Sequence, residues 1–181
     1  MKKKYFIVVL TIVSIFKISS QELIIGEERL DPGIKFIFEG AIKDKVFPLS
    51  RNLIESETNV HIEARVNWDI SNVPKGTPKG GFIPYLKIIS IIKNQSSGIK
   101  TFIDLFPHIN LIDNFHYARN ISLPGNIKDL YTVEFIINPP SESELFFHKD
   151  WNENYGENIF NKVNYIYTDV DFEEIANSSR K

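Results

Sequence analysis

Four histidines, His61, His108, His116 and His148, are the residues of this 181-residue sequence best suited to chemistry. Glu63 follows His61 by two positions, so in a β-strand the imidazole and the carboxylate lie on the same face. Imidazole and carboxylate groups are common ligands of divalent metal ions. Spacing alone leaves two interpretations open, namely one shared metal site or four incidental histidines on the surface and in the core.

Other chemistries lack the residues that they require. The sequence contains no cysteine, which excludes disulfide scaffolds, zinc ribbons, iron–sulfur clusters, blue-copper centres and thiol nucleophiles. It has no Gly-x-Ser-x-Gly turn for an activated serine and no glycine-rich phosphate loop before a helix. The acidic pairs Asp169/Asp171 and Glu173/Glu174 are typical of a solvated face. We therefore expect a binding protein and no enzyme.

The charge of the chain is divided unevenly along its length. The first twenty residues contain Lys2, Lys3, Lys4 and Lys17 and no acidic residue, whereas the remainder has 17 basic and 23 acidic residues. Because nucleic-acid binding depends on an excess of positive charge, the acidic remainder argues against a nucleic-acid partner.

Residues 1–20 have the layout of a secretory signal peptide. Lys2–Lys4 precede the apolar run Tyr5–Phe16, and two serines follow. The run is shorter than the roughly 20 residues that a membrane-spanning helix needs. We therefore expect residues 21–181 to form an exported domain that is not inserted in a membrane, with a retained N-terminal anchor as the alternative. The frequent Ile, Lys and Asn are typical of an AT-rich bacterial genome, for which export means the periplasm.

The exported part reads as a series of short strands. In 59–68, apolar Val60, Ile62 and Ala64 alternate with polar neighbours, which predicts a half-buried strand. Turn residues separate most of the candidates, and no segment keeps a helical period; 152–161 is expected to be a loop or one helical turn. This pattern predicts an all-β fold, a single immunoglobulin-like antiparallel β-sandwich. The candidate strands are Ile34–Ile42, Asn59–Trp68, Phe82–Lys93, Ile99–Leu105, His116–Leu123, Tyr131–Asn138 and Val163–Asp171.

Four sequence blocks, in order, resemble the periplasmic Fe2+ transport protein family. Lys79–Leu86 (KGGFIPYL) is similar to that family's Gly-x-Trp/Phe-x-Pro-Tyr-Leu signature. Phe106–Asn120 is similar to its Met-Pro-Met…Asp-Gly-Pro-His-Tyr-Gly-x-Asn motif, Val60–Ala64 to its His-x-Glu strand, and Phe147–Asp150 to its Gly-Arg-His-x-Asp motif. Every histidine of the chain falls in one of these blocks.

The resemblance implies a fold, a ligand set and partners. Members are exported, are encoded beside iron permeases, form homodimers and have an immunoglobulin-like sandwich. The ligand set that it implies is a copper- or iron-class site, with Asp113 at an acidic position associated with additional metal binding. The residues of this set are His61, Glu63, His108, His116, His148 and Asp113.

Several departures from the family pattern affect the choice of metal. His108 stands where the family usually has methionine, the loop after it is one residue longer, Asn114-Phe115 replaces Gly-Pro, and Ala118 replaces glycine. A thioether favours Cu(I), whereas imidazole suits divalent ions. We therefore expect Cu(II) and/or Fe(II), with Zn(II) or Mn(II) also compatible.

Two function classes follow. The first is a periplasmic divalent-metal-binding protein that assists uptake of iron, or of a similar metal, by delivering it to an inner-membrane permease. The resemblance implies a homodimer, for which the apolar segment Phe82–Ile92 is the expected interface; the alternative is that this segment fills the core of the sandwich. The alternative is an exported immunoglobulin-like interaction or adhesion module whose histidines are incidental. Metal content of untagged protein separates the two.

Overall fold

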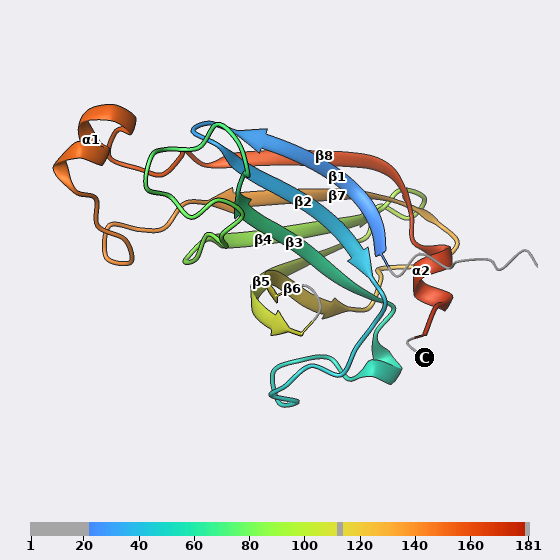
Figure 1. Ribbon diagram of the computed structural model, residues 1–181. Coiled ribbons are helices and arrows are strands. Elements are labelled where there is room, and N and C mark those ends of the chain that lie inside the picture. The colour runs from blue at the N-terminus through green and yellow to red at the C-terminus, as the bar shows by residue number, and fades with distance from the viewer. Residues whose placement is uncertain (1–21, 112–113, 180–181) are drawn as a thin grey trace, which may run out of the picture.

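The computed structural model describes residues 22–111 and 114–179 (Figure 1). The expected signal peptide and Asp113 lie outside the described residues. The rest is organised by eight β-strands, with two short α-helices and one turn of 3-10 helix at Glu55–Glu57. The helices are α1 (Lys149–Tyr155) and α2 (Glu173–Asn177). The strands are β1 (Glu22–Leu30), β2 (Ile34–Ala41), β3 (Val60–Trp68), β4 (Lys87–Asn94), β5 (Lys100–Asn110), β6 (Asn114–Ile121), β7 (Leu130–Asn138) and β8 (Val163–Asp171).

The strands follow the order β1-β2-β3-β6-β5-β4-β7-β8, and each neighbouring pair is antiparallel. β5 changes partner along its length. Its first half pairs with β4 as far as Leu105, which lies opposite Ile88, and its second half pairs with β6 from Phe106, which lies opposite Ala118. This exchange folds the sheet into two facing layers, so the predicted all-β antiparallel sandwich is confirmed.

The two end strands of the sheet, β1 and β8, lie side by side and nearly close the structure (Figure 1). The hydroxyl of Tyr167 on β8 donates a hydrogen bond to Oε1 of Glu28 on β1, at 3.0 Å. Gly26 allows this approach, because a Cβ atom there would lie only 2.2 Å from the ring of Tyr167.

The core lies between the layers and contains one face of each central strand. On β2, Phe36 and Phe38 are fully buried, and the ring of Phe38 stacks on Phe135 of β7 with 4.1 Å between centroids. On β3, Val60, Ile62 and the other even-numbered residues point inward as the alternation predicts. Burial of such side chains contributes about 1.5–3 kcal/mol each before the entropy of folding is subtracted.

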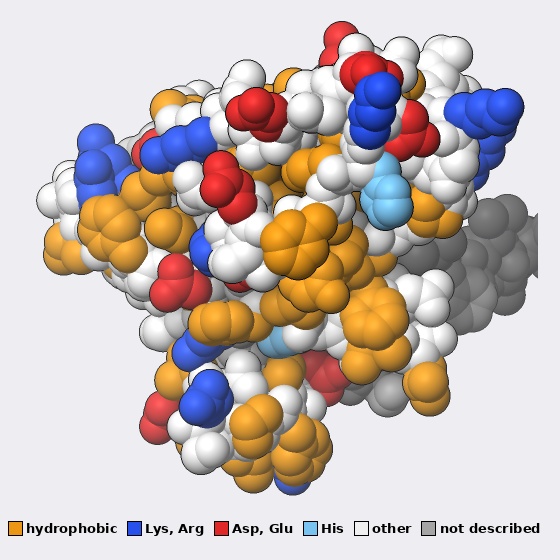
Figure 2. Space-filling view, turned by 90° about the vertical axis from the view of Figure 1, so that its left-hand side faces the viewer, with side chains coloured by type: hydrophobic (Ala, Val, Ile, Leu, Met, Phe, Trp, Pro, Cys, Tyr) orange, Lys and Arg blue, Asp and Glu red, His pale blue; other side chains and the backbone are white. Residues whose placement is uncertain are grey.

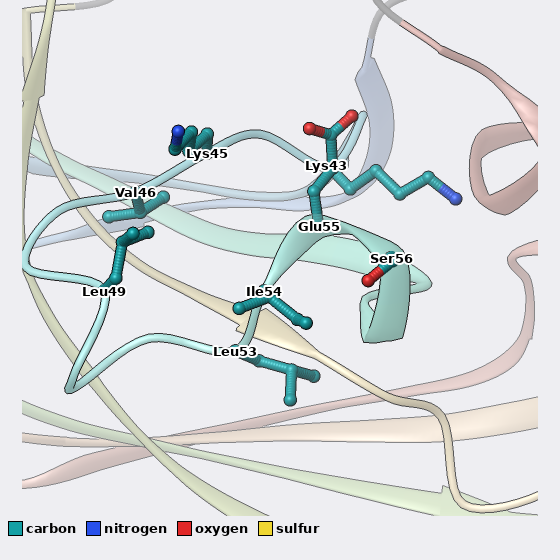
Figure 3. A pocket seen from close by; sticks show the side chains of 8 residues that line it. All are labelled: Lys43, Lys45, Val46, Leu49, Leu53, Ile54, Glu55 and Ser56. Atoms are coloured by element: carbon teal, nitrogen blue, oxygen red, sulfur yellow. The ribbon is translucent and has the colours of Figure 1, made fainter.

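The opposite face of β3 is also covered at its beginning, which the sequence pattern did not indicate. His61 and Glu63 are only 3% and 2% exposed. The cover is the segment between β2 and β3, residues 42–59, which we call the β2–β3 loop; it hangs below the sheet in Figure 1. Its own side chains, including Val46, Leu49 and Leu53, line a hollow of about 450 Å³ (Figure 3).

Several element predictions need correction. β1 was not predicted, and the segment Phe82–Leu86 is not part of β4, which begins at Lys87. β5 extends five residues beyond its predicted end, so His108 lies in a strand and not in a connection. No helix in the described part of the chain is long and apolar enough to cross a membrane.

Candidate metal centre

Three of the four histidines converge on the outer face of the sheet. His61 lies on β3, His108 on β5 and His116 on β6. One ring nitrogen from each can be chosen so that all three lie within 4.8 Å of one another. The ring centroids are 5.3 Å apart for His61 and His108, 6.2 Å for His61 and His116, and 5.9 Å for His108 and His116.

Strand register explains this convergence. His108 and His116 lie directly opposite each other in the β5–β6 pair. His61 lies opposite Asn120, four residues after His116 on β6 and therefore on the same face. His108 reaches this face because the second half of β5 pairs with β6. Residues far apart in the sequence thus meet through two ladders of hydrogen bonds.

Glu63 adds a carboxylate to the three imidazoles. Its Oε1 lies 3.7 Å from Nε2 of His61 and 4.0 Å from Nε2 of His116. Its side chain is almost completely buried, as are those of the two histidines. It therefore adds an anionic oxygen to the imidazole nitrogens, and divalent cations bind this combination of ligands.

The centre opens into a hollow of about 340 Å³ between the sheet and the β2–β3 loop. His61, His108 and His116 line its sheet side, and loop residues 44–47 line the other side. His108 is partly exposed, whereas His61 and His116 are buried. His108 is therefore the ligand candidate nearest to solvent.

The pKa of His108 lies well below the usual value of 6.5, at about 4. Burial is the main cause, and the charges of His116 and Arg119 act in the same direction. The ring is therefore neutral at neutral pH. A neutral imidazole has the lone pair that a metal ligand needs.

Two buried polar residues surround the histidines. Oδ1 of Asn120 lies 2.7 Å from Nδ1 of His61. Glu39 on β2 lies opposite Glu63 in the β2–β3 pair and accepts a hydrogen bond from the guanidinium of Arg65. Burial raises the pKa of Glu39 to about 7, although Arg65 opposes the shift. Sequence reasoning gave Asn120 no role beyond its motif and missed Glu39, because only the register reveals its position.

Of the remaining two predicted site residues, only His148 can be placed in the structure. His148 is the exposed residue that precedes α1, and it is not among the three histidines that converge. Helix α1 lies at one end of the molecule, at the left in Figure 1. Asp113 is outside the described residues, between β5 and β6.

The donor set fits a divalent metal ion. Three imidazole nitrogens lie within 4.8 Å of one another, a carboxylate oxygen of Glu63 lies near those of His61 and His116, and the described residues contain neither cysteine nor methionine. Nitrogen and oxygen ligands of this kind suit Fe(II), Cu(II) and Zn(II), whereas Cu(I) prefers sulfur. The arrangement can bind and release an ion, and nothing in it requires a redox step.

Comparison with known proteins agrees with this chemistry. The family model described as Fe2+ transport protein matches residues 19–174. The chain is also similar to the 34 kDa membrane antigen of Treponema pallidum (strain Nichols), with 29% identity over 96 residues, or 53% of this chain. That match spans 46% of the antigen, so the chain corresponds to less than half of its relative.

Two solved structures have a similar fold. A copper-bound variant of FetP from uropathogenic Escherichia coli strain F11 aligns with a TM-score of 0.67 and 22% identity, covering 82% of this chain and 96% of FetP. A copper-bound variant of P19 from Campylobacter jejuni aligns with a TM-score of 0.67 and 24% identity, covering 81% of this chain and 94% of P19. At these identities the likeness establishes the fold alone.

Proposed function

Because the chain belongs to the Fe2+ transport protein family, we propose that it is a periplasmic protein that binds a divalent metal ion and delivers it to an inner-membrane metal permease. The observation that carries the proposal is the convergence of His61, His108 and His116 beside the buried carboxylate of Glu63. Four potential metal ligands from three separate strands lie together on one face of the sheet. Histidines without a shared role would have no reason to gather in this way.

In this proposal the three histidines are the ligands supplied by one chain, and Glu63 is a fourth ligand or orients the ring of His61. Iron, Fe(II), is the proposed cargo in view of the family, and Cu(II) is proposed as a second ion that the same donors accept. The copper bound in the FetP and P19 variants supports this choice. Zn(II) and Mn(II) are compatible with the same donors.

The proposal includes a homodimer. Hydrophobic side chains gather in the middle of the face shown in Figure 2. Phe82, Phe106 and Phe115 line an apolar hollow of about 540 Å³, and Phe106 and Phe115 are each about half exposed. A contribution of His148 to the metal centre would have to come from a second copy, because His148 is not part of the cluster formed within one chain. Asp113 stays proposed as a ligand of an additional ion.

Metal titration of untagged protein tests the binding proposal. We expect one Fe(II) or Cu(II) per chain, measured by calorimetry, with Fe(II) kept under anaerobic conditions. The variants His61→Ala and His116→Ala should weaken binding severely, and Glu63→Gln should weaken it about 10–100-fold, as is typical when a carboxylate supporting a ligand is lost. Asn164→Ala is the control, because the side chain of Asn164 on β8 donates to Glu134 of β7, and this variant should bind metal as the unmodified protein does.

Unchanged affinity in both alanine variants would mean that the histidines are incidental and would favour the alternative, an interaction or adhesion module. Delivery needs a separate experiment. The permease is placed in vesicles, and the metal-loaded protein is added on the side of the membrane that corresponds to the periplasm. The vesicles should take up metal faster from the loaded protein than from an equal amount of free metal. Equal rates would limit the function to binding or storage.

A further inference from the structure

We propose that Asn120 is a positioning residue that fixes the tautomer of His61 and fastens the β2–β3 loop over the metal centre. Asn120 lies on β6, opposite His61, and is 3% exposed. It contacts both a metal-ligand candidate on the sheet and the loop. The inference rests on the proposed function, because it assigns Asn120 a role at the same metal centre.

The orientation of the Asn120 side chain is set by the loop. Its Nδ2 atom donates to the carbonyl oxygen of Asp44 at 2.8 Å and to the carbonyl oxygen of Leu53 at 2.9 Å. An amide nitrogen has two N–H groups, and both are used in these bonds. The reversed orientation would place the amide oxygen against two carbonyl oxygens. Oδ1 is therefore the atom that faces His61.

This orientation determines which nitrogen of His61 has the proton. Oδ1 of Asn120 can only accept a hydrogen bond, and it lies 2.7 Å from Nδ1 of His61. The proton of the neutral ring must therefore be on Nδ1, and the lone pair is on Nε2. Nε2 is the nitrogen that lies 3.7 Å from Oε1 of Glu63. The nitrogen with the lone pair and the carboxylate therefore lie on the same side of the ring, and both are groups that bind divalent cations.

The same amide connects the two arms of the loop. Asp44 lies on the arm that leaves β2, and Leu53 on the arm that returns toward β3. Residues 44–47 of the first arm form the loop side of the hollow that contains the three histidines. Leu53 also lines the apolar hollow inside the loop (Figure 3). The Asn120 side chain therefore links the two arms of the cover and orients one ligand of the centre, while Arg119 on the same strand adds a hydrogen bond to the carbonyl oxygen of Arg51.

Loop closure and metal binding are consequently coupled. A metal ion can bind Nε2 of His61 only when the proton is on Nδ1. Metal binding would therefore strengthen the hydrogen bond from Nδ1 to Asn120 and stabilise the closed position of the loop. By linkage, a closed loop raises the affinity for the metal by the same factor. Residues that orient a metal-binding histidine from outside typically affect affinity about 10–100-fold.

Two substitutions at this position separate the two roles. Asn120→Ala removes the acceptor for His61 and both donors to the loop. Asn120→Asp keeps an oxygen for Nδ1 of His61, replaces both donors to the loop by an acceptor and adds a negative charge. The tautomer of His61 is read from the nitrogen chemical shifts of 15N-labelled protein, loop closure from the hydrogen exchange of the amides of residues 42–59, and metal affinity from titration with Cu(II) and Fe(II). Asn164→Ala is the control.

In metal-free unmodified protein we expect His61 to have its proton on Nδ1. Asn120→Asp should keep this tautomer, but its loop amides should exchange faster. In Asn120→Ala the tautomer should no longer be fixed, the loop amides should exchange faster, and metal should bind about 10–100-fold more weakly. An Nε2-protonated His61 in the unmodified protein would overturn the inference, as would unchanged loop exchange in Asn120→Asp. If Asn120→Ala does not fold, the tautomer of His61 in the unmodified protein and the loop exchange of Asn120→Asp still test the inference. They need no metal, so failure of the unmodified protein to bind metal would reject the proposed function and leave this test intact.

Discussion

His108 and His116 face each other directly across the β5–β6 pair, with 5.9 Å between their ring centroids. At this distance a positive charge on one ring disfavours a positive charge on the other, which is one reason for the low pKa of His108. Burial, which is the main cause of the shift, and this pairing together keep a metal-ligand candidate neutral over a wide range of pH. They also make the chain sensitive to acid in a way that can be measured.

The first prediction concerns His108 in the metal-free protein. Its pKa is about 4 in the folded state and near 6.5 in the unfolded chain, so between these values only the unfolded chain takes up the proton. The free energy of unfolding should therefore fall as the pH falls from about 6.5 to about 4. Urea unfolding at several pH values measures this, and His108→Ala should lack the His108 contribution. An NMR titration that gives His108 a pKa near 6.5 would contradict the prediction.

The second prediction concerns Glu39, whose contribution has the opposite sign. Its pKa is about 7 when folded and near 4.5 when unfolded, so between these values only the folded chain keeps the proton. This group lowers stability as the pH rises from about 4.5 to about 7. The contributions of Glu39 and His108 partly cancel in the unmodified protein, and Glu39→Gln should make stability rise more steeply with pH. Parallel curves for Glu39→Gln and the unmodified protein would show that the pKa of Glu39 is close to normal.

The third prediction concerns the choice of metal. His108→Met places a thioether among the imidazoles and should raise the affinity for Cu(I) relative to Zn(II). Competition with a chromogenic Cu(I) chelator measures the change. Ile166→Met is a matched control, because Ile166 lies on β8, is 57% exposed and does not line the hollow that contains the histidines. Equal gains in the two variants would show that position 108 does not select the metal.

The fourth prediction concerns Tyr117, which connects two of the recognised sequence blocks. Its buried hydroxyl donates to the carbonyl oxygen of Ile83 at 2.8 Å and accepts from the backbone N–H of Leu86 at 3.1 Å. Tyr117→Phe leaves two buried backbone groups without these bonds and should lower the free energy of unfolding by about 1–3 kcal/mol. Tyr85→Phe, an exposed tyrosine in the same segment, should change stability by less than about 0.5 kcal/mol. Equal effects would mean that the Tyr117 hydroxyl has no special structural role.

The strands of the core were predictable because alternation of apolar and polar residues is a local property. β3, β7 and β8 begin and end within one residue of their predicted bounds. β1 was missed because Gly26 and the charged Glu27–Arg29 resemble a loop, and only contact with β2 and β8 makes this segment a strand. The predicted strand Phe82–Lys93 began too early. Tyr117, from a distant strand, forms hydrogen bonds to the backbone of Ile83 and Leu86 and holds this segment outside β4.

The ligand candidates were predictable only in part. Sequence blocks selected the histidines and Glu63, but their convergence depends on the change of partner within β5 and on the β3–β6 register, which are not local properties. The same limit applies to Asn120 and Glu39, whose partners lie on other strands. His148 was chosen by its block, and within one chain the fold places it outside the cluster.

The contact between β1 and β8 has a consequence for the behaviour of the protein at high concentration. An open sheet exposes unpaired N–H and C=O groups at its two edges, and such edges are templates for intermolecular strand pairing and aggregation. Here the two edges lie against each other, joined by the hydrogen bond from Tyr167 to Glu28 and by the close approach at Gly26. At this contact each edge hinders a second molecule from pairing with the other, which should oppose growth of the sheet into a fibre.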